Sequence, residues 1–505
     1  MTPTFTALDF AVLLAYLVGT TLLGIWVGRR QRDARDYFVA DRAIPWPAVM
    51  FSIVASETSA LTFISIPGLA WATDLGFLQV AAGYILGRIA VAYTLLPRYY
   101  EGELVTAYTL LEKRFGKETR RFTSIVFMVT RAMADAVRVF ATAIPVALIL
   151  GGTIRRDLVM PVAVLILGLL TVVYTYRGGM KAVVWTEIVQ ASVYIFGGLS
   201  AIVLIGRAVP GGWSAIFDMA APAGKLRAID TAFVLSRPHT VWSGLIGGAF
   251  LSMASHGADQ LIVQRLLTAR SLRDSQKAII GSGIVVFFQF VLFLMIGVGL
   301  WALFQGRTFA APDAVFPTFI IEYMPHGLLG LILAAIVAAT MSTHSGAINS
   351  LAAATLHDIY LPLTGHTPES PKALRMGKLF SVLWGVGLTG AALLFKEGAT
   401  PAVIVALGIA SFTYGALLGG FFLGIFVHRA RQRDAILGMS VALVVMASIV
   451  FSKQLVAANP GLTPILGSFR GIAVYWYVFI GTIITVLVGS ISSLFGRREP
   501  APVRA

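Results

Sequence analysis

Cysteine and charge are scarce in this chain. Its 505 residues include no cysteine, which excludes disulfides, thiolate metal sites and iron–sulfur clusters. Only 12% of the residues are charged, whereas a soluble domain usually carries about 25%. The seven histidines are scattered and offer no pair suited to haem, so redox chemistry within a membrane is not expected. No segment is large enough to form a soluble catalytic domain.

Long apolar segments take the place of the missing charge, and 57% of the residues are hydrophobic. Thirteen segments are each long enough to cross a hydrocarbon core of roughly 30 Å. They cover residues 7–27, 46–70, 77–97, 122–150, 158–176, 181–206, 241–264, 278–304, 327–357, 376–395, 400–428, 434–452 and 471–495. The first has no basic residue before it and no small-residue cleavage site, so we expect a retained span rather than a signal peptide. The pattern predicts an all-α polytopic membrane protein with thirteen transmembrane helices.

The basic residues are distributed as in a membrane protein, although the net charge of +15 would also suit a nucleic-acid binder. Most of them lie in alternate short loops, such as 113–121, 265–277 and 429–433, and this bias orients membrane proteins. It predicts an N-terminus outside and a C-terminus in the cytoplasm. We therefore expect a multi-pass protein of the cell (inner) membrane. Its partner would be the lipid bilayer, and no nucleic acid is expected to bind.

Two of the predicted spans carry small polar residues and a carboxylate in their middle. The span 46–70 contains Ala55–Ala60, and the span 241–264 contains Ser252–Gln260. A backbone opened at this depth cannot face lipid, but it can line an internal site whose ligands are freed carbonyls and half-helix ends. The alternative is that these residues only allow close helix packing.

Their positions favour the first interpretation and divide the chain into five parts. Five spans lie in 46–206 and five in 241–428, and each block begins with an interrupted helix, so the pattern predicts a 5+5 inverted-repeat core with two broken helices. Residues 1–45 would add an N-terminal helix and a basic loop, and residues 429–505 two C-terminal helices and a short basic tail. The extracytoplasmic loop 207–240 has room for a short surface helix.

Charged side chains inside spans are costly and indicate function. They are Glu57, Arg88, Arg131, Asp135, Arg138, Glu187 and Asp259. Arg131, Asp135 and Arg138 share one helical face. This face either attracts an anion, with Asp135 holding one arginine, or forms an internal ion pair that locks the bundle. The sequence suggests no partner for Arg88.

The span 327–357 holds a cluster of uncharged oxygens. Its members are Thr340, Ser342, Thr343, Ser345 and Asn349. Sodium is a hard cation that prefers hydroxyl, carbonyl and carboxylate oxygens, so Ser342 and Thr343 beside an opened span 46–70 would suit it. Alternatively, these hydroxyls bond to their own helix or pack against a neighbour.

At these residues the sequence resembles the sodium:solute symporter family, which includes proline, sugar, sialic acid, iodide and vitamin carriers. The resemblance covers nearly the whole chain. It is carried by Asp36–Arg42, Ala55–Ala60, Pro67-Gly68, Thr106–Tyr108, Arg114-Phe115, Tyr176–Met180, Val184–Gln190, Asp259–Arg265, the Ser/Thr run of span 327–357 and Asp358–Tyr360. It implies a leucine-transporter-like fold with one extra helix at the N-terminus and two at the C-terminus.

The resemblance also implies a main sodium site. Its ligands would be the backbone carbonyls of Ala55, Thr58 and Ala339 and the hydroxyls of Ser342 and Thr343.

Two glutamates are implied as further cation or coupling carboxylates. Glu57 stands where proline carriers have an aspartate important for sodium, and Glu187 where the family usually has aspartate. The longer side chain of Glu187 leaves a second sodium site, and hence the stoichiometry, open.

By the same resemblance, six residues are candidates for substrate contact. They are Ser59, Thr62, Phe77, Gln79, Arg138 and His256. The arginines on span 122–150 favour a carboxylate-bearing solute, whereas Ser59, Thr62 and Gln79 would equally suit a sugar.

These observations predict a sodium-coupled secondary active symporter that imports a small organic solute by alternating access and works as a monomer. The nearest alternatives are a proton-coupled symporter, in which Glu57 and Glu187 titrate, and a sodium-coupled sugar carrier. A passive channel is a further alternative. An enzyme is not expected, because the sequence offers no metal-ligand cluster and no nucleophile–base pair.

Overall fold

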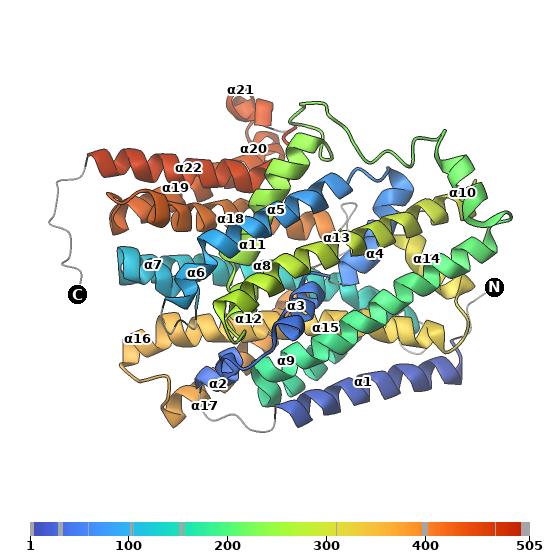
Figure 1. Cartoon of the computed structure of the whole chain (residues 1–505), viewed down its shortest axis with the longest axis horizontal. Coiled ribbons are helices and arrows are strands. Elements are labelled where there is room, and N and C mark those ends of the chain that lie inside the picture. Colours follow the sequence, from blue (N-terminus) through green and yellow to red (C-terminus); the bar gives the residue numbers. More distant parts are fainter. Residues whose placement is uncertain are drawn as a thin grey trace.

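The computed structural model describes residues 5–28, 34–58, 60–101, 104, 106–150, 155, 157–309, 311–395, 402–469 and 471–495. In this part of the chain all regular secondary structure is helical, and the helices form one bundle with most axes along its longest dimension (Figure 1). The long helices are α1 (Ala7–Val27), α5 (Leu78–Thr94), α8 (Lys117–Leu150), α9 (Val159–Ala208), α13 (Leu272–Leu303), α15 (Leu328–Ala354), α17 (Pro371–Ala392), α18 (Ala402–Phe426), α19 (Gln432–Val450) and α22 (Trp476–Leu494).

Shorter helices supply the breaks, loops and caps of the bundle. They are α2 (Ala34–Val39), α3 (Trp46–Glu57), α4 (Ala60–Ala72), α6 (Leu96–Tyr100), α7 (Tyr108–Phe115), α10 (Gly212–Ala220), α11 (Gly248–Gly257), α12 (Gln260–Leu266), α14 (Val315–Tyr323), α16 (Leu361–Thr364), α20 (Ser452–Ala458) and α21 (Thr463–Leu466). The surface helix that we expected in the loop 207–240 is α10.

The apolar segments are confirmed as membrane-spanning in character. Seven helical stretches in the described residues are long and apolar enough to cross a bilayer, and the bent pair α3–α4 counts as an eighth if it is one span. Every segment predicted from the sequence falls on a helix. The chain is therefore an all-helical polytopic membrane protein, whereas the count of thirteen crossings and the inverted repeat remain predictions.

Both interrupted spans are broken helices. Helix α3 ends at Glu57 and α4 begins at Ala60, and the two axes differ by 59°. Helix α11 ends at Gly257, and the extended backbone of Asp259 (φ −89°, ψ 122°) separates it from α12. The Asp259 carboxylate accepts a 2.7 Å bond from the Leu261 amide and so caps α12.

Helix α9 is divided by a kink at the junction of the two spans predicted there. Two spans, 158–176 and 181–206, were predicted here, and the backbone of Gly179 between them is non-helical (φ 55°, ψ −160°). A Cβ at this position would lie 2.7 Å from the carbonyl oxygen of Tyr37. The glycine is needed both for the positive φ and for this close approach.

Helix α15 lies at the centre of the bundle. Nearly all of its residues are buried, and it packs against α1, α3, α8, α9 and α17. Helix α1, in contrast, exposes a row of large apolar side chains, as expected of a lipid-facing edge. Because α3 also packs against α15, the first helix break lies beside the central helix.

Candidate functional site

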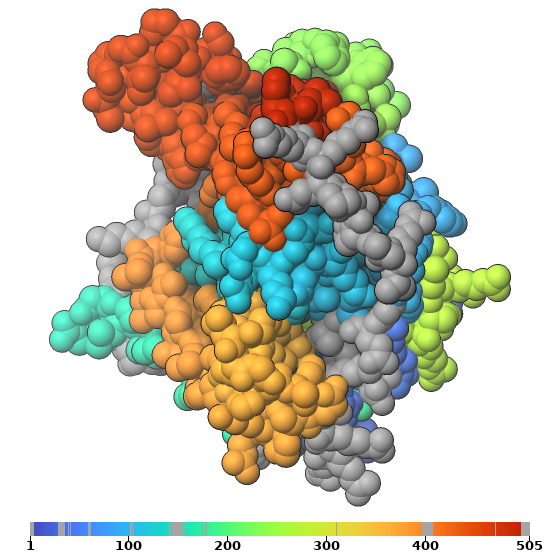
Figure 2. Space-filling view, turned by 90° about the vertical axis from the view of Figure 1, so that its left-hand side faces the viewer, coloured from blue at the N-terminus to red at the C-terminus, as the bar shows by residue number. Residues whose placement is uncertain are grey.

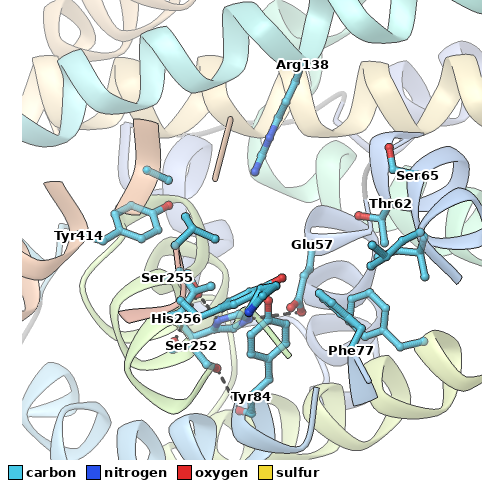
Figure 3. Close-up of a pocket in the computed structure, with 18 of the residues that line it drawn as sticks. Glu57, Thr62, Ser65, Phe77, Tyr84, Arg138, Ser252, Ser255, His256 and Tyr414 are labelled. Atoms are coloured by element: carbon cyan, nitrogen blue, oxygen red, sulfur yellow. Dashed lines mark hydrogen bonds and ion pairs between the residues drawn. The ribbon is translucent and has the colours of Figure 1, made fainter. Parts of the chain in front are cut away.

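A cavity of about 450 Å³ lies between the two helix breaks (Figure 3). Its deep end is formed by Ser56 and Glu57 at the first break and by Asp259 at the second. Its mouth is formed by residues on the side of the loop 207–240, including His239, Asp313 and Tyr475. Burial lowers the pKa of the His239 imidazole and raises that of the Asp313 carboxyl, so both groups at the mouth are biased toward their neutral forms.

Four of the six predicted substrate residues line this cavity. They are Thr62, Phe77, Arg138 and His256. The Arg138 side chain projects from α8 toward the centre of the cavity, with Glu57, His256 and Tyr84 facing it from the other side (Figure 3). Ser59 lies outside the described residues.

Gln79 lies away from the cavity wall. Its amide nitrogen donates to the carbonyls of Gly76 (3.2 Å) and His239 (3.0 Å), and its amide oxygen accepts from the Asp230 backbone (3.1 Å). These bonds attach the loop 207–240 to the start of α5.

Glu57 provides the partner for Arg88 that the sequence did not suggest. The fully buried Arg88 guanidinium forms an ion pair with Glu57 and donates a 2.8 Å bond to the Ser282 hydroxyl. Glu57 remains 19% exposed toward the cavity, where the Nε2 atom of His256 lies 3.6 Å from its carboxylate. This pair is therefore a charged part of the cavity wall.

The charged face of α8 is connected differently from the expectation that Asp135 holds one of its arginines. Arg131 lies 3.5 Å from the Asp259 carboxylate, which also accepts a 2.5 Å bond from Tyr414. Asp135 instead contacts His344 on α15 at 2.6 Å. The reason is the break after α11, which places the Asp259 carboxylate beside α8.

The residues implied for the main sodium site are buried where α3 and α15 meet. Helix α3 ends at Glu57, so the Ala55 carbonyl belongs to the last turn of a helix. The Ser342 hydroxyl donates to Glu187 (3.0 Å) and the Thr343 hydroxyl to the Ala339 carbonyl (3.1 Å), and each keeps lone pairs for a cation. The described residues contain no group of three His, Asp or Glu side chains that could hold a metal ion.

Glu187 is enclosed by donors and has no exposed surface. Arg265 approaches it through Nη2 (2.5 Å) and Nε (3.3 Å), and both side chains are 0% exposed. Further bonds come from the hydroxyls of Ser52, Ser56 and Ser342.

Tyr99, Ala107 and Tyr108 cover the α11–α12 junction on the side away from the mouth. Tyr108 donates to the Ala258 carbonyl (3.3 Å), the Ala107 amide donates to Gln260 (2.8 Å), and Tyr99 donates to the Gly257 carbonyl. At this end of the molecule α6 and α7 lie between the C-terminal helices and the end of α15 with α16 (Figure 2).

The model of the sodium:solute symporter family matches residues 37–442. The chain belongs to this family. As a member of it, the protein is a sodium-coupled solute symporter with sodium as the co-transported ion, and the members of this family are transporters.

Several relatives of this symporter share its full length. It is 29% identical to the sodium/sialic acid symporter NanT of Aliivibrio fischeri, over 97% of this chain and 93% of that protein. It is 28% identical to the sodium/sialic acid symporter SiaT of Proteus mirabilis, over 97% and 95% of the two chains. A solved Na⁺-coupled sialic acid symporter in a substrate-bound, outward-open state superimposes with a TM-score of 0.83 at 28% identity, covering 97% of this chain and 99% of that one.

Sequence reasoning missed several residues of the symporter's site. Arg265 follows a helix break and was counted with the basic loop 265–277, whereas it lies in α12 and is fully buried. Tyr414 and His344 resemble ordinary polar residues of apolar spans. The only signal that could have found them is the set of buried carboxylates, each of which requires a partner.

Proposed function

We propose that this symporter imports a small hydroxylated carboxylate, of the sugar-acid type, together with sodium. The observation that carries the proposal is the Arg138 guanidinium, which projects into a cavity of about 450 Å³ between the helix breaks. A guanidinium binds a carboxylate through two parallel hydrogen bonds. Thr62 and Ser255 add hydroxyls to the wall, and the volume lies within the range of small-molecule sites. The substrate of the two sialic acid symporters agrees with this chemistry.

The sodium ion would bind between α3 and α15. Its ligands would be the carbonyls of Ala55, Thr58 and Ala339 and the hydroxyls of Ser342 and Thr343, which are the hard oxygens that sodium prefers. Binding there would fix the end of α3 and the start of α4, and α4 carries part of the solute cavity. Sodium and solute would consequently strengthen each other's binding by the same factor.

The direction of transport would follow from the position of the cavity mouth, which opens on one side of the molecule. Solute and sodium enter from the side of the loop 207–240, and release requires Tyr99, Ala107 and Tyr108 to separate from the α11–α12 junction. The bias of basic residues supports an inner-membrane protein with its N-terminus outside and its C-terminus in the cytoplasm. We propose that a monomer suffices, because the cavity is built within one chain.

The test is a thermal-shift screen of the purified protein against sugar acids, amino acids and neutral sugars, with and without sodium, followed by uptake into proteoliposomes. A carboxylate should raise Tm only when sodium is present. Arg138→Ala should weaken its binding by roughly 100-fold, which corresponds to the loss of a charge-assisted pair, whereas Arg237→Ala in the exposed loop should bind normally. Equal stabilisation by the amide of the same solute, or unchanged binding by Arg138→Ala, would refute the proposal.

A further inference from the structure

The Glu187 carboxylate has no lone pair left for a metal ion. Its Oε1 atom accepts from Arg265 (2.5 Å), Ser56 (3.0 Å) and Ser342 (3.0 Å), and its Oε2 atom accepts from Ser52 and from Arg265 (3.3 Å). A carboxylate offers about four lone-pair sites, and five hydrogen bonds occupy them here.

Gly346 makes this arrangement of Arg265 fit. A Cβ at position 346 would lie 2.5 Å from Nη2 of Arg265 and 3.2 Å from the Leu261 side chain. The glycine stands in the middle of α15, where it weakens a helix relative to alanine. Its lack of a side chain creates the space that the guanidinium fills.

We infer that Arg265 is a tethered counter-ion that takes the place of a second sodium ion at Glu187, so that the symporter binds one sodium ion per cycle. A carboxylate with no exposed surface needs one positive charge beside it, and the guanidinium supplies that charge permanently. A sodium ion at Glu187 would have to displace the guanidinium, which would then be buried without a partner.

The pair also prepares the proposed sodium site. The Ser342 hydroxyl has one hydrogen, and it points at Glu187. Its lone pairs are thereby turned away from the carboxylate and remain available to a cation. This part of the inference rests on the proposed function, because it assumes that sodium binds at Ser342 and Thr343.

The test is equilibrium binding of ²²Na⁺ to the purified, solute-free protein, counted per polypeptide at saturation. The wild type should bind one ion, Arg265→Gln should bind two, and Arg265→Lys, which keeps the charge, should bind one. Arg270→Gln removes a charge from the exposed start of the following loop and should also bind one. Gly346→Ser, which pushes the guanidinium away, should raise the count to two even if Arg265→Gln is unstable.

Thr343→Ala separates this inference from the proposed sodium site, because Thr343 does not contact Glu187. It should abolish binding in the wild type and leave one ion in Arg265→Gln. Two ions bound to the wild type, or one ion bound to both Arg265→Gln and Gly346→Ser, would overturn the inference. A single wild-type ion that survives Thr343→Ala would instead overturn the proposed main site.

Discussion

The two buried glutamate–arginine pairs differ in access rather than in chemistry. Glu57–Arg88 joins α3 to α5 and is 19% exposed at the glutamate, in the wall of the cavity. Glu187–Arg265 joins α9 to α12 and is exposed at neither residue. When a solute or water can reach an ion pair, its charged groups can form new hydrogen bonds during transport. An ion pair without exposed surface can only neutralise the charge of its own two residues. The same combination of glutamate and arginine is thus part of a binding site at Glu57–Arg88 and a fixed, internally neutralised pair at Glu187–Arg265.

The largest effect is expected from breaking the sealed pair. Glu187→Gln leaves Arg265 charged and buried without an anion, which should lower stability by about 3–5 kcal/mol. The measurement is Tm in detergent, with and without sodium. The double variant Glu187→Leu/Arg265→Met removes both charges and should recover most of the loss. If the double variant is no more stable than the single one, packing rather than charge explains the loss.

Breaking the cavity-facing pair should cost less stability and more affinity. In Glu57→Gln, Arg88 keeps Ser282 and gains access to water in the cavity, so the expected loss is about 1–3 kcal/mol. Solute affinity should change several-fold, because a charge in the cavity wall has been removed. Measuring Tm and titrating the solute on the same preparation checks both the loss of stability and the change in affinity. If Glu57→Gln loses as much stability as Glu187→Gln, the exposure of a pair does not determine how much its loss costs.

The smallest effects are expected from matched removal of one hydroxyl at each pair. Ser52→Ala takes a donor from Glu187, and Ser282→Ala takes an acceptor from Arg88. Each should lower stability by about 1 kcal/mol, with Ser52→Ala the larger because no water can replace its hydroxyl. Paired thermal unfolding curves measure the difference. The reverse order would indicate that the Glu187 cluster is hydrated.

The sequence predicted the helices well because lipid imposes a simple requirement on composition. The segment 7–27 is α1 residue for residue, and the polar interruptions at Glu57 and Asp259 are the two helix breaks. The boundary predicted between the spans 158–176 and 181–206 is the kink at Gly179, whereas the close approach of Tyr37, a neighbour far away in the sequence, could not be predicted.

Pairing of charges was the part of the site that the sequence could not give. Thr62, Phe77, Arg138 and His256 reach the cavity as expected, since polar or aromatic groups beside a break face inward. Which carboxylate meets which cation depends on packing between distant helices.

If the symporter binds one sodium ion per cycle, as inferred above, the Arg265–Glu187 pair sets a ceiling on how far it can concentrate its solute. A tenfold sodium gradient stores about 1.4 kcal/mol per ion, so one ion can sustain at most a tenfold gradient of a monocarboxylate. A cargo of one sodium ion and one monocarboxylate would be electroneutral, so a voltage of 100 mV, which is worth about 2.3 kcal/mol per charge, would add nothing. Such a carrier suits a cell that consumes the solute as it enters rather than one that stores it.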